Sequence, residues 1–583
     1  GVLFEWLAMA GALNRVSVLL VSMIAVGLGI FLSSKSHLQA ERLVKEETAP
    51  RLVVYSVWTL FGILTWLNFQ HAVFYPPNYW DALIYYLYYS KLIFLNSGIP
   101  FPMDSNGFPE LVQCQVGLGL GANYAHLFLL WQASVCNLAG EWSTFPGQWI
   151  PPIAGLGTAL LVYGTILSRT RNHRVALLSL LVVQSAPYWI WYQQWVSDYP
   201  LAVWFTVAAI ALMGVRHDSP SSALLPMILV ATAGSHLNYL MASLWIFPIF
   251  LWLSLSKPVI FSGKTIGLLI GGMVLSSTWF IRNWMVTGNP VYAFFPEIFG
   301  GINIDRDVLK SCQIEWALNG DGLRQVGSTV FKRIKNTPLY FLEDANTSMK
   351  LAALPLGWLI PGLLFYFGRG KQCLYRVSIL AYLSLLFFYE YFISPLYLYH
   401  ILPVVPMMVL IAADWMVEVD RYKVSRWILG IVTLAGLFSF GIPTALMGSK
   451  VTSPSLWQTL QPGMNREVFL DRALEGSYAT FEYLNEHLEE DSVLLTHENR
   501  HLYLRDDIKF LHLDDYRLID WYGKPPEEVL ARLRELGVDY YLKIRNERNH
   551  QILEELGVDN LLQDHFELVY DRGENLLYRL KSE

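Results

Sequence analysis

Long apolar runs without charged residues fill most of the first 450 positions, and short charged segments separate them. A window of about 20 residues, the length of a helix that crosses a bilayer, selects about twelve such runs. They cover approximately residues 16–34, 52–70, 149–167, 175–193, 199–215, 221–235, 237–255, 264–283, 350–368, 374–393, 396–415 and 426–447. This pattern predicts a polytopic α-helical membrane protein with about 12 spans, although 16–34 could instead be a signal-anchor.

The segment 111–138 is also apolar, but its interior is rich in glycine. Each glycine inside a helix costs about 1 kcal/mol relative to alanine. Irregular backbone at membrane depth occurs only where protein or a water-filled cavity covers it. We therefore expect 111–138 to be a re-entrant or surface-lying segment that does not cross the membrane.

Basic residues orient the spans, because short cytoplasmic loops are enriched in Lys and Arg. With 111–138 not crossing, the basic clusters fall in alternate loops. They are Lys35, Arg42, Lys45 and Arg51; Arg169, Arg171 and Arg174; Arg216; Lys257 and Lys264; Arg369, Lys371 and Arg376; and Arg421, Lys423 and Arg426. This orientation places the loops 71–148 and 284–349, and everything after about residue 448, outside the cytoplasm.

The tail has a different composition, being charged and mixed in pattern. Helical runs at 478–488, 526–536 and 551–556 alternate with short β-type runs. The β-type runs cover 492–495, 540–544, 566–570 and 576–580. Such alternation predicts a small α/β domain, with Gly573 in a hairpin turn. We expect a transmembrane domain over 1–450 and an extracytoplasmic α/β domain over 451–583.

Composition agrees with a membrane protein and argues against several other classes. Hydrophobic residues make up 54% of the 583 positions and charged residues only 15%, with a mean hydropathy of +0.35. The net charge of −6 argues against nucleic acid as a partner. No glycine-rich nucleotide-binding motif is present. The four cysteines lack C-x-x-C spacing, which favours packing over a metal or redox role.

Several polar residues fall near the outer face of this arrangement, although only Lys and Arg were used to orient it. They are Asp81, Asp198, His236, Arg282 and His400. Ionisable groups near lipid normally face protein or water and have a function. Each also has a structural explanation: the acids could favour helix N-termini, Arg282 could be an interfacial anchor, and the histidines could be hydrogen-bonded packing residues.

The sequence around these residues resembles polyprenyl-phosphate-sugar-dependent glycosyltransferases of the GT-C fold, a group that includes aminoarabinose and protein mannosyl transferases. The resemblance rests on YWDALIYY at 79–86 with Lys91, GIP at 98–100 and FPE at 108–110, on WFIRN at 279–283 with TGNPVY at 287–292, and on DYP at 198–200. It spans about residues 50–415. Two positions depart from the pattern: Ala82 stands where many relatives have a second acid, and Tyr399-His400 where many have Arg or Lys.

The resemblance implies an enzyme that moves a sugar from a polyprenyl-phosphate donor to an acceptor lipid, glycan or protein, in a bacterial or archaeal cell membrane. Such a reaction needs a base for the acceptor hydroxyl and a positive group for the departing phosphate. We expect Asp81 to be the base, Asp198 to orient the acceptor or a divalent metal, and Arg282 to bind phosphate. Other substrate-binding candidates are His236, His400 and Asn289. The role of Lys91 is left open.

Two other functions remain possible from the sequence. A transporter or flippase of a lipid-linked solute would have repeat-related broken helices and ionisable residues near the bilayer midplane. The chain has no evident internal repeat, and its candidate acids gather at one surface. A non-catalytic membrane subunit could bind a partner through the tail, but acids at both outer positions argue against it.

Overall fold

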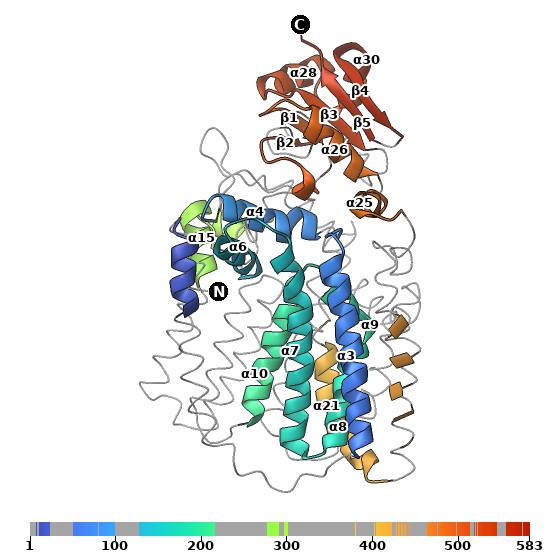
Figure 1. The fold of residues 1–583 in the computed structure, drawn as a ribbon. Helices are drawn as coiled ribbons and strands as arrows, with labels where there is room; N and C mark the ends of the chain where they lie inside the picture. Colours follow the sequence, from blue (N-terminus) through green and yellow to red (C-terminus); the bar gives the residue numbers. More distant parts are fainter. Residues whose placement is uncertain are drawn as a thin grey trace, which may run out of the picture.

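A computed structural model of the chain describes a helical body with a small α/β unit at one end (Figure 1). The described residues are 7–8, 11–23, 50–79, 81–99, 127–215, 277–290, 296–300, 404–422, isolated positions between 379 and 443, and most of 463–582. The C-terminus lies in the α/β unit, and the described N-terminal residues lie near the junction of the two parts (Figure 1).

Apolar helices that run side by side make up the helical body (Figure 1). They are α3 (Arg51–Phe74), α7 (Phe145–Thr170), α8 (His173–Ser185), α10 (Tyr199–Val215) and α21 (Val404–Asp420), with the short α9 (Pro187–Gln194) beside them. Helix α7 packs against α3, α8, α10 and α21. Their shared core is aliphatic and contains the fully buried Trp189.

Two described helices, Arg51–Ala72 and Phe145–Thr170, are long and apolar enough to cross a membrane. They coincide with the runs predicted at 52–70 and 149–167. The run at 175–193 forms two helices, α8 and α9, rather than one, and its crossing of the membrane stays a prediction. Ala186 has extended backbone and separates α8 from α9, because Pro187 disfavours helical geometry in the residue before it. The runs at 221–255 and 350–368 lie outside the described residues.

Buried amide side chains join α3, α8 and α9 inside the helical body. The Asn68 amide donates to Gln193 Oε1 at 3.3 Å, and the Gln184 amide donates to the same oxygen at 3.1 Å. Gln194 donates back to Asn68 Oδ1 at 3.3 Å. Polar groups in an apolar interior are costly unless they are hydrogen-bonded. This amide cluster therefore fixes the three helices against one another.

The shorter helices α4 (Leu87–Leu95), α6 (Leu127–Ala139) and α15 (Thr278–Thr287) lie at the end of the body that faces the α/β unit (Figure 1). The four-residue helix α16 (Pro296–Phe299) follows α15 in the sequence. Helix α6 packs against α4 and includes the second half of the segment predicted not to cross. Residues 111–126 lie outside the described part of the chain, so that prediction remains one.

The α/β unit contains a five-stranded sheet in the order β2-β1-β3-β5-β4. Strand β1 (Val493–Thr496) pairs in parallel with β2 (Lys509–His512) and β3 (Tyr540–Ile544). Strand β5 (Asn575–Leu580) pairs antiparallel with β3 and with β4 (Phe566–Arg572). The helices are α25 (Arg466–Ala473), α26 (Ser477–His487), α28 (Pro526–Glu535) and α30 (Leu562–His565).

The four strands predicted from the tail are confirmed, each within two residues at either end. Gly573 has φ +63° in the turn between β4 and β5, as the hairpin prediction required. Strand β2 was missed, because it is only four residues long and begins with a lysine. The boundary near residue 450 and the extracytoplasmic location of this unit stay predictions.

Candidate active site

Asp81 lies at the start of a π-helical turn. Helix α3 ends before Tyr75, whose backbone is extended, and two prolines follow it. The chain then forms the π-helix η1 (Ala82–Tyr86), in which the Leu87 N–H donates to the Ala82 carbonyl, and continues into α4. Short π-helical turns are rare and are frequent at functional sites. This turn sets the direction in which the side chains after Asp81 point.

Each of the two predicted acids accepts a hydrogen bond from a tyrosine. The Tyr79 hydroxyl donates to Asp81 Oδ2 at 2.8 Å. The Tyr86 hydroxyl donates to Asp198 Oδ1 at 2.6 Å, and both Tyr86 and Asp198 are buried. Asp198 directly precedes α10, so the two acids come from distant segments of the chain. The bond from Tyr86 to Asp198 joins the second acid to the helical turn that begins at Asp81.

Burial raises the pKa of Asp81 from 3.8 to about 6; the hydrogen bond from Tyr79 lowers it and the charge of Asp198 raises it further. A carboxyl group with a pKa near 6 is ionised at neutral pH and still basic enough to accept a proton. Burial also raises the pKa of Tyr86 well above 10, and the negative charges of Asp198 and Asp81 add to this rise. Tyr86 is therefore a protonated hydrogen-bond donor between two acids.

Arg282 reaches the same helix from α15. Its side chain is buried, and its Nη1 donates to Asn283 Oδ1 at 3.4 Å. Burial raises the pKa of Tyr89, whereas the charge of Arg282 and its hydrogen bond to Tyr89 act against that rise. Tyr86 and Tyr89 are three residues apart on η1 and α4. They connect the acids on one side with the guanidinium group on the other.

Solved structures share this architecture. The structure of ArnT from Cupriavidus metallidurans bound to undecaprenyl phosphate matches with a TM-score of 0.53 and 12% identity, over 91% of this chain and 98% of that chain. ArnT in the apo state matches with a TM-score of 0.55 and 12% identity, over 90% and 98%. The protein has the GT-C fold. This confirms the resemblance found in the sequence at the level of the fold.

The other comparisons found no relatives. No protein-family model matches the sequence, and no curated protein does so either. At 12% identity the likeness to ArnT concerns the fold of the chain. The roles of individual residues in this protein therefore rest on its own geometry.

Asn289 has a described contact that is structural. Gly288 ends α15 with φ +76°, a left-handed conformation that favours glycine. The buried Asn289 amide then donates to the Gly300 carbonyl at 3.0 Å, which holds α15 near α16. Its predicted contact with substrate stays a prediction.

The two predicted histidines, His236 and His400, lie outside the described residues. Among the residues that the structure describes, no group of three or more His, Cys, Asp or Glu side chains could hold a metal ion. The expectation that Asp198 orients the acceptor or a divalent metal stays a prediction.

Tyr79, Tyr86 and Tyr89 were not among the site residues predicted from the sequence. Tyrosine is commonly enriched at membrane interfaces, so its presence beside a span does not by itself mark a site. The available signal was their position: all three lie within eight residues of Asp81, and two of them are three residues apart in a helical run. Residues with that spacing share a helix face. The π-helical turn that directs them has no sequence signature.

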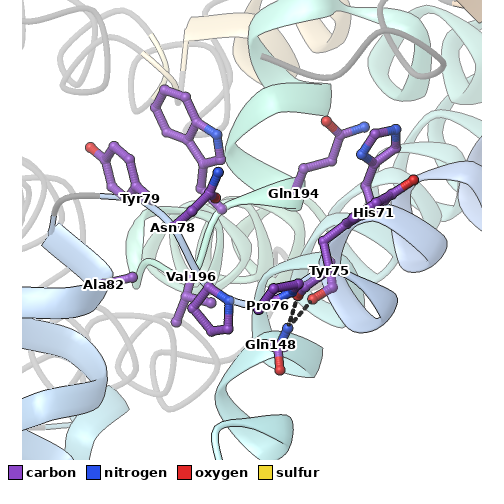
Figure 2. Close-up of a pocket in the computed structure, with 12 residues that line it drawn as sticks. His71, Tyr75, Pro76, Asn78, Tyr79, Ala82, Gln148, Gln194 and Val196 are labelled. Atoms are coloured by element: carbon purple, nitrogen blue, oxygen red, sulfur yellow. Dashed lines mark hydrogen bonds between the residues drawn. The ribbon is translucent and has the colours of Figure 1, made fainter. Parts of the chain in front are cut away.

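A small polar cavity lies beneath the segment that leads to Asp81 (Figure 2). Its volume is about 30 Å³, which accommodates about one or two water molecules and no sugar ring. Gln148 donates to the carbonyls of Ala72 and Tyr75 at 2.8 and 2.7 Å. The Tyr79 ring stacks on Trp195 with centroids 4.2 Å apart. These contacts support the backbone that carries Asp81.

Proposed function

We propose that this protein is a membrane glycosyltransferase that moves a sugar from a polyprenyl-phosphate donor to an acceptor outside the cytoplasm. The observation that carries the proposal is the joined site: Asp81 with a pKa near 6, beside Asp198, and connected through Tyr86 and Tyr89 to the buried Arg282. The fold supports it, because ArnT shares the architecture and was solved with undecaprenyl phosphate.

The reaction assigns a role to each group. Asp81 accepts the proton of the acceptor hydroxyl as that oxygen bonds to the anomeric carbon of the sugar. The bond between that carbon and the phosphate oxygen breaks, and the polyprenyl phosphate leaves with the electron pair. Arg282 stabilises the negative charge on the departing phosphate, because a guanidinium group binds phosphate oxygens in a fixed geometry.

Asp198 orients the acceptor, and Tyr86 holds its carboxylate in place. Carboxylate oxygens are also the donors that hard divalent cations prefer. If such a metal takes part, Asp81 and Asp198 would hold it, and its charge would help to orient the acceptor. His236, His400 and Asn289 are proposed to contact the substrates.

The proposed location is a bacterial or archaeal cell membrane, with the site and the α/β unit facing outward. The donor carries its sugar on a lipid phosphate within the membrane. The acceptor is a lipid, glycan or protein at the outer face.

The direct test is transfer of sugar from polyprenyl-phosphate donors by the purified full-length protein in lipid nanodiscs. Asp81→Asn should lower transfer by about 10²- to 10⁴-fold, the usual contribution of a general base. Asp414→Asn is the matched control, since Asp414 pairs with Arg169 at 3.4 Å and lies near the other end of the bundle. Equal activities of the two variants would refute the assignment of Asp81.

A further inference from the structure

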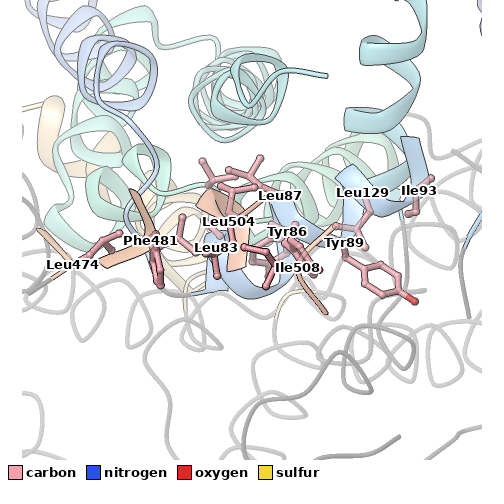
Figure 3. Close-up of a cluster of buried hydrophobic side chains, with 14 of the residues drawn as sticks. Leu83, Tyr86, Leu87, Tyr89, Ile93, Leu129, Leu474, Phe481, Leu504 and Ile508 are labelled. Carbon is pink, nitrogen blue, oxygen red and sulfur yellow. The ribbon is translucent and has the colours of Figure 1, made fainter. Parts of the chain in front are cut away.

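The α/β unit packs directly on the helix that carries the candidate site. One hydrophobic cluster contains residues of both parts (Figure 3). Leu83, Tyr86 and Leu87 come from η1 and α4, whereas Phe481 and Leu504 come from the α/β unit. All five side chains are buried. The two parts therefore share an apolar core rather than a solvated contact.

Three specific contacts join the α/β unit to this part of the chain: one lies before Asp81, and two lie in α4, which follows it. The Tyr503 hydroxyl donates to the Pro77 carbonyl. The ring of Tyr88 meets His501 edge to face, with centroids 5.5 Å apart. The Lys91 ammonium pairs with Asp506 Oδ1 at 2.6 Å.

The contacting segment of the α/β unit is itself fixed in place. His501 stacks on Phe510 with centroids 3.9 Å apart, and its Nε2 lies 2.9 Å from the Glu498 carbonyl oxygen. Arg500 pairs with the buried Glu498 and donates to Ser477 Oγ at 2.9 Å. Glu498, Arg500 and His501 are thus tied to the rest of the α/β unit, and the residues that follow them contact the neighbouring segment.

The held segment needs such support. Residues 75–79 have no regular secondary structure between α3 and η1, and they include Pro76 and Pro77, which have no backbone N–H to donate. The Pro77 carbonyl is two residues from Tyr79, whose hydroxyl binds the Asp81 carboxylate. A shift at Pro77 would therefore move both the tyrosine and the acid.

We propose that Tyr503 and the Lys91–Asp506 pair are positioning residues for the candidate active site. The geometry of that site then depends on the α/β unit. They hold residues 77–91 in the arrangement that places Asp81 beside Asp198. The expected effect of these contacts on turnover rests on the proposed glycosyl transfer. Their effect on the backbone of residues 78–95 can be measured by hydrogen exchange without any transfer.

The first test uses Tyr503→Phe in the full-length protein, which removes the hydroxyl and keeps the ring. Misplaced reacting groups lower turnover, so kcat should fall about tenfold while KM for the donor changes less than about twofold. Amide hydrogen exchange in residues 78–95 should become about tenfold faster. The control is Tyr483→Phe, whose hydroxyl donates to the Val569 carbonyl within the α/β unit at 3.4 Å.

The second test exchanges charges at the ion pair. Lys91→Glu should lower kcat and speed exchange in residues 78–95, and the double variant Lys91→Glu with Asp506→Lys should restore both. Lys509→Glu is the control, because its pair with Asp491 is exposed and lies on the α/β unit alone. A double variant no better than Lys91→Glu alone would count against the pair.

Identical exchange and turnover in Tyr503→Phe and Tyr483→Phe would overturn the inference. Faster exchange with unchanged turnover would also overturn it, since the contact would then be structural only. If the native protein transfers no sugar from any polyprenyl-phosphate donor, the proposed function fails. The exchange measurements alone would then decide whether Tyr503 and the Lys91–Asp506 pair hold residues 77–91 in position.

Discussion

Asp81 is partly buried, accepts a hydrogen bond from Tyr79 and lies near Asp198. These three features set the pKa of its carboxyl group. Its pKa of about 6 means that the basic form dominates above pH 6. If Asp81 is the base, kcat/KM should be constant above about pH 7 and fall about tenfold for each pH unit below 6. A pH–rate profile measures this. An acid limb near pH 4 would mean that another group is the base.

The same environment makes the ionised Asp81 unfavourable for folding. The folded pKa is raised above the unfolded value of 3.8, so the protein loses stability as pH rises from about 4 to 6, and the loss is complete above pH 6. Asp81→Asn should therefore raise the melting temperature at pH 8 by the equivalent of about 1–3 kcal/mol. The difference should vanish below pH 4. Melting curves at pH 8 and pH 4 are the measurement, and a destabilised variant at pH 8 would contradict it.

The Tyr86 hydroxyl joins Asp198 to the helical segment η1–α4, which follows Asp81. Tyr86→Phe removes the hydroxyl that donates to Asp198 at 2.6 Å. We expect transfer to fall about tenfold and stability to fall by about 1–3 kcal/mol, because a buried carboxylate loses a hydrogen bond. Transfer assays and melting curves measure both. The control is Tyr163→Phe, whose hydroxyl contacts His173 Nε2 at 2.8 Å on the far side of the bundle.

At the scale of elements, the helical run that follows Asp81 ends at Leu95, and Asn96 is its C-cap. Glycine at position 98 fits a close approach of two segments, since a side chain there would come within 2.8 Å of the Ala8 carbonyl oxygen. The π-helical turn could not be predicted, because apolar periodicity does not distinguish an extra residue in one turn. The break at Ala186 was readable in principle from Pro187, but the run around it is apolar throughout.

Two glycines of α7 test how tightly this helix packs against the amide cluster. A side chain at Gly155 of α7 would lie 2.2 Å from the Gln193 amide, which is buried and hydrogen-bonded. Gly155→Ala should therefore destabilise the protein by about 1–3 kcal/mol through overpacking. Gly164 of the same helix has open space, so Gly164→Ala should be neutral or stabilising by up to about 1 kcal/mol. Thermal unfolding compares them, and equal effects would contradict the packing.

For the whole molecule, the apolar runs and the charged tail predicted the two parts of the chain but not how they meet. The contact between Tyr503 and Pro77 joins residues 426 positions apart. Neither residue has a local pattern that marks it as a partner. The acids and Arg282 were found because charge near lipid is unusual, whereas the tyrosines that connect them resemble interfacial residues.

Orientation in the membrane is a prediction for the whole chain. Tyr422 is exposed just beyond α21, within a basic cluster predicted to be cytoplasmic. Ser582 is exposed beyond β5 and adjoins the C-terminus, which lies in the α/β unit (Figure 1). In a background without native cysteines, a membrane-impermeant thiol reagent should label Ser582→Cys in intact cells. It should label Tyr422→Cys only after the membrane is permeabilised.

The reverse labelling would place η1 and α4 on the cytoplasmic side, because both pack against the α/β unit that contains Ser582. Labelling of both positions from one side would mean that the chain between them crosses the membrane an even number of times or not at all. Labelling of Ser582→Cys in intact cells is the result that lets Asp81 meet an acceptor outside the cytoplasm. The orientation test therefore decides where transfer takes place, independently of which residue is the base.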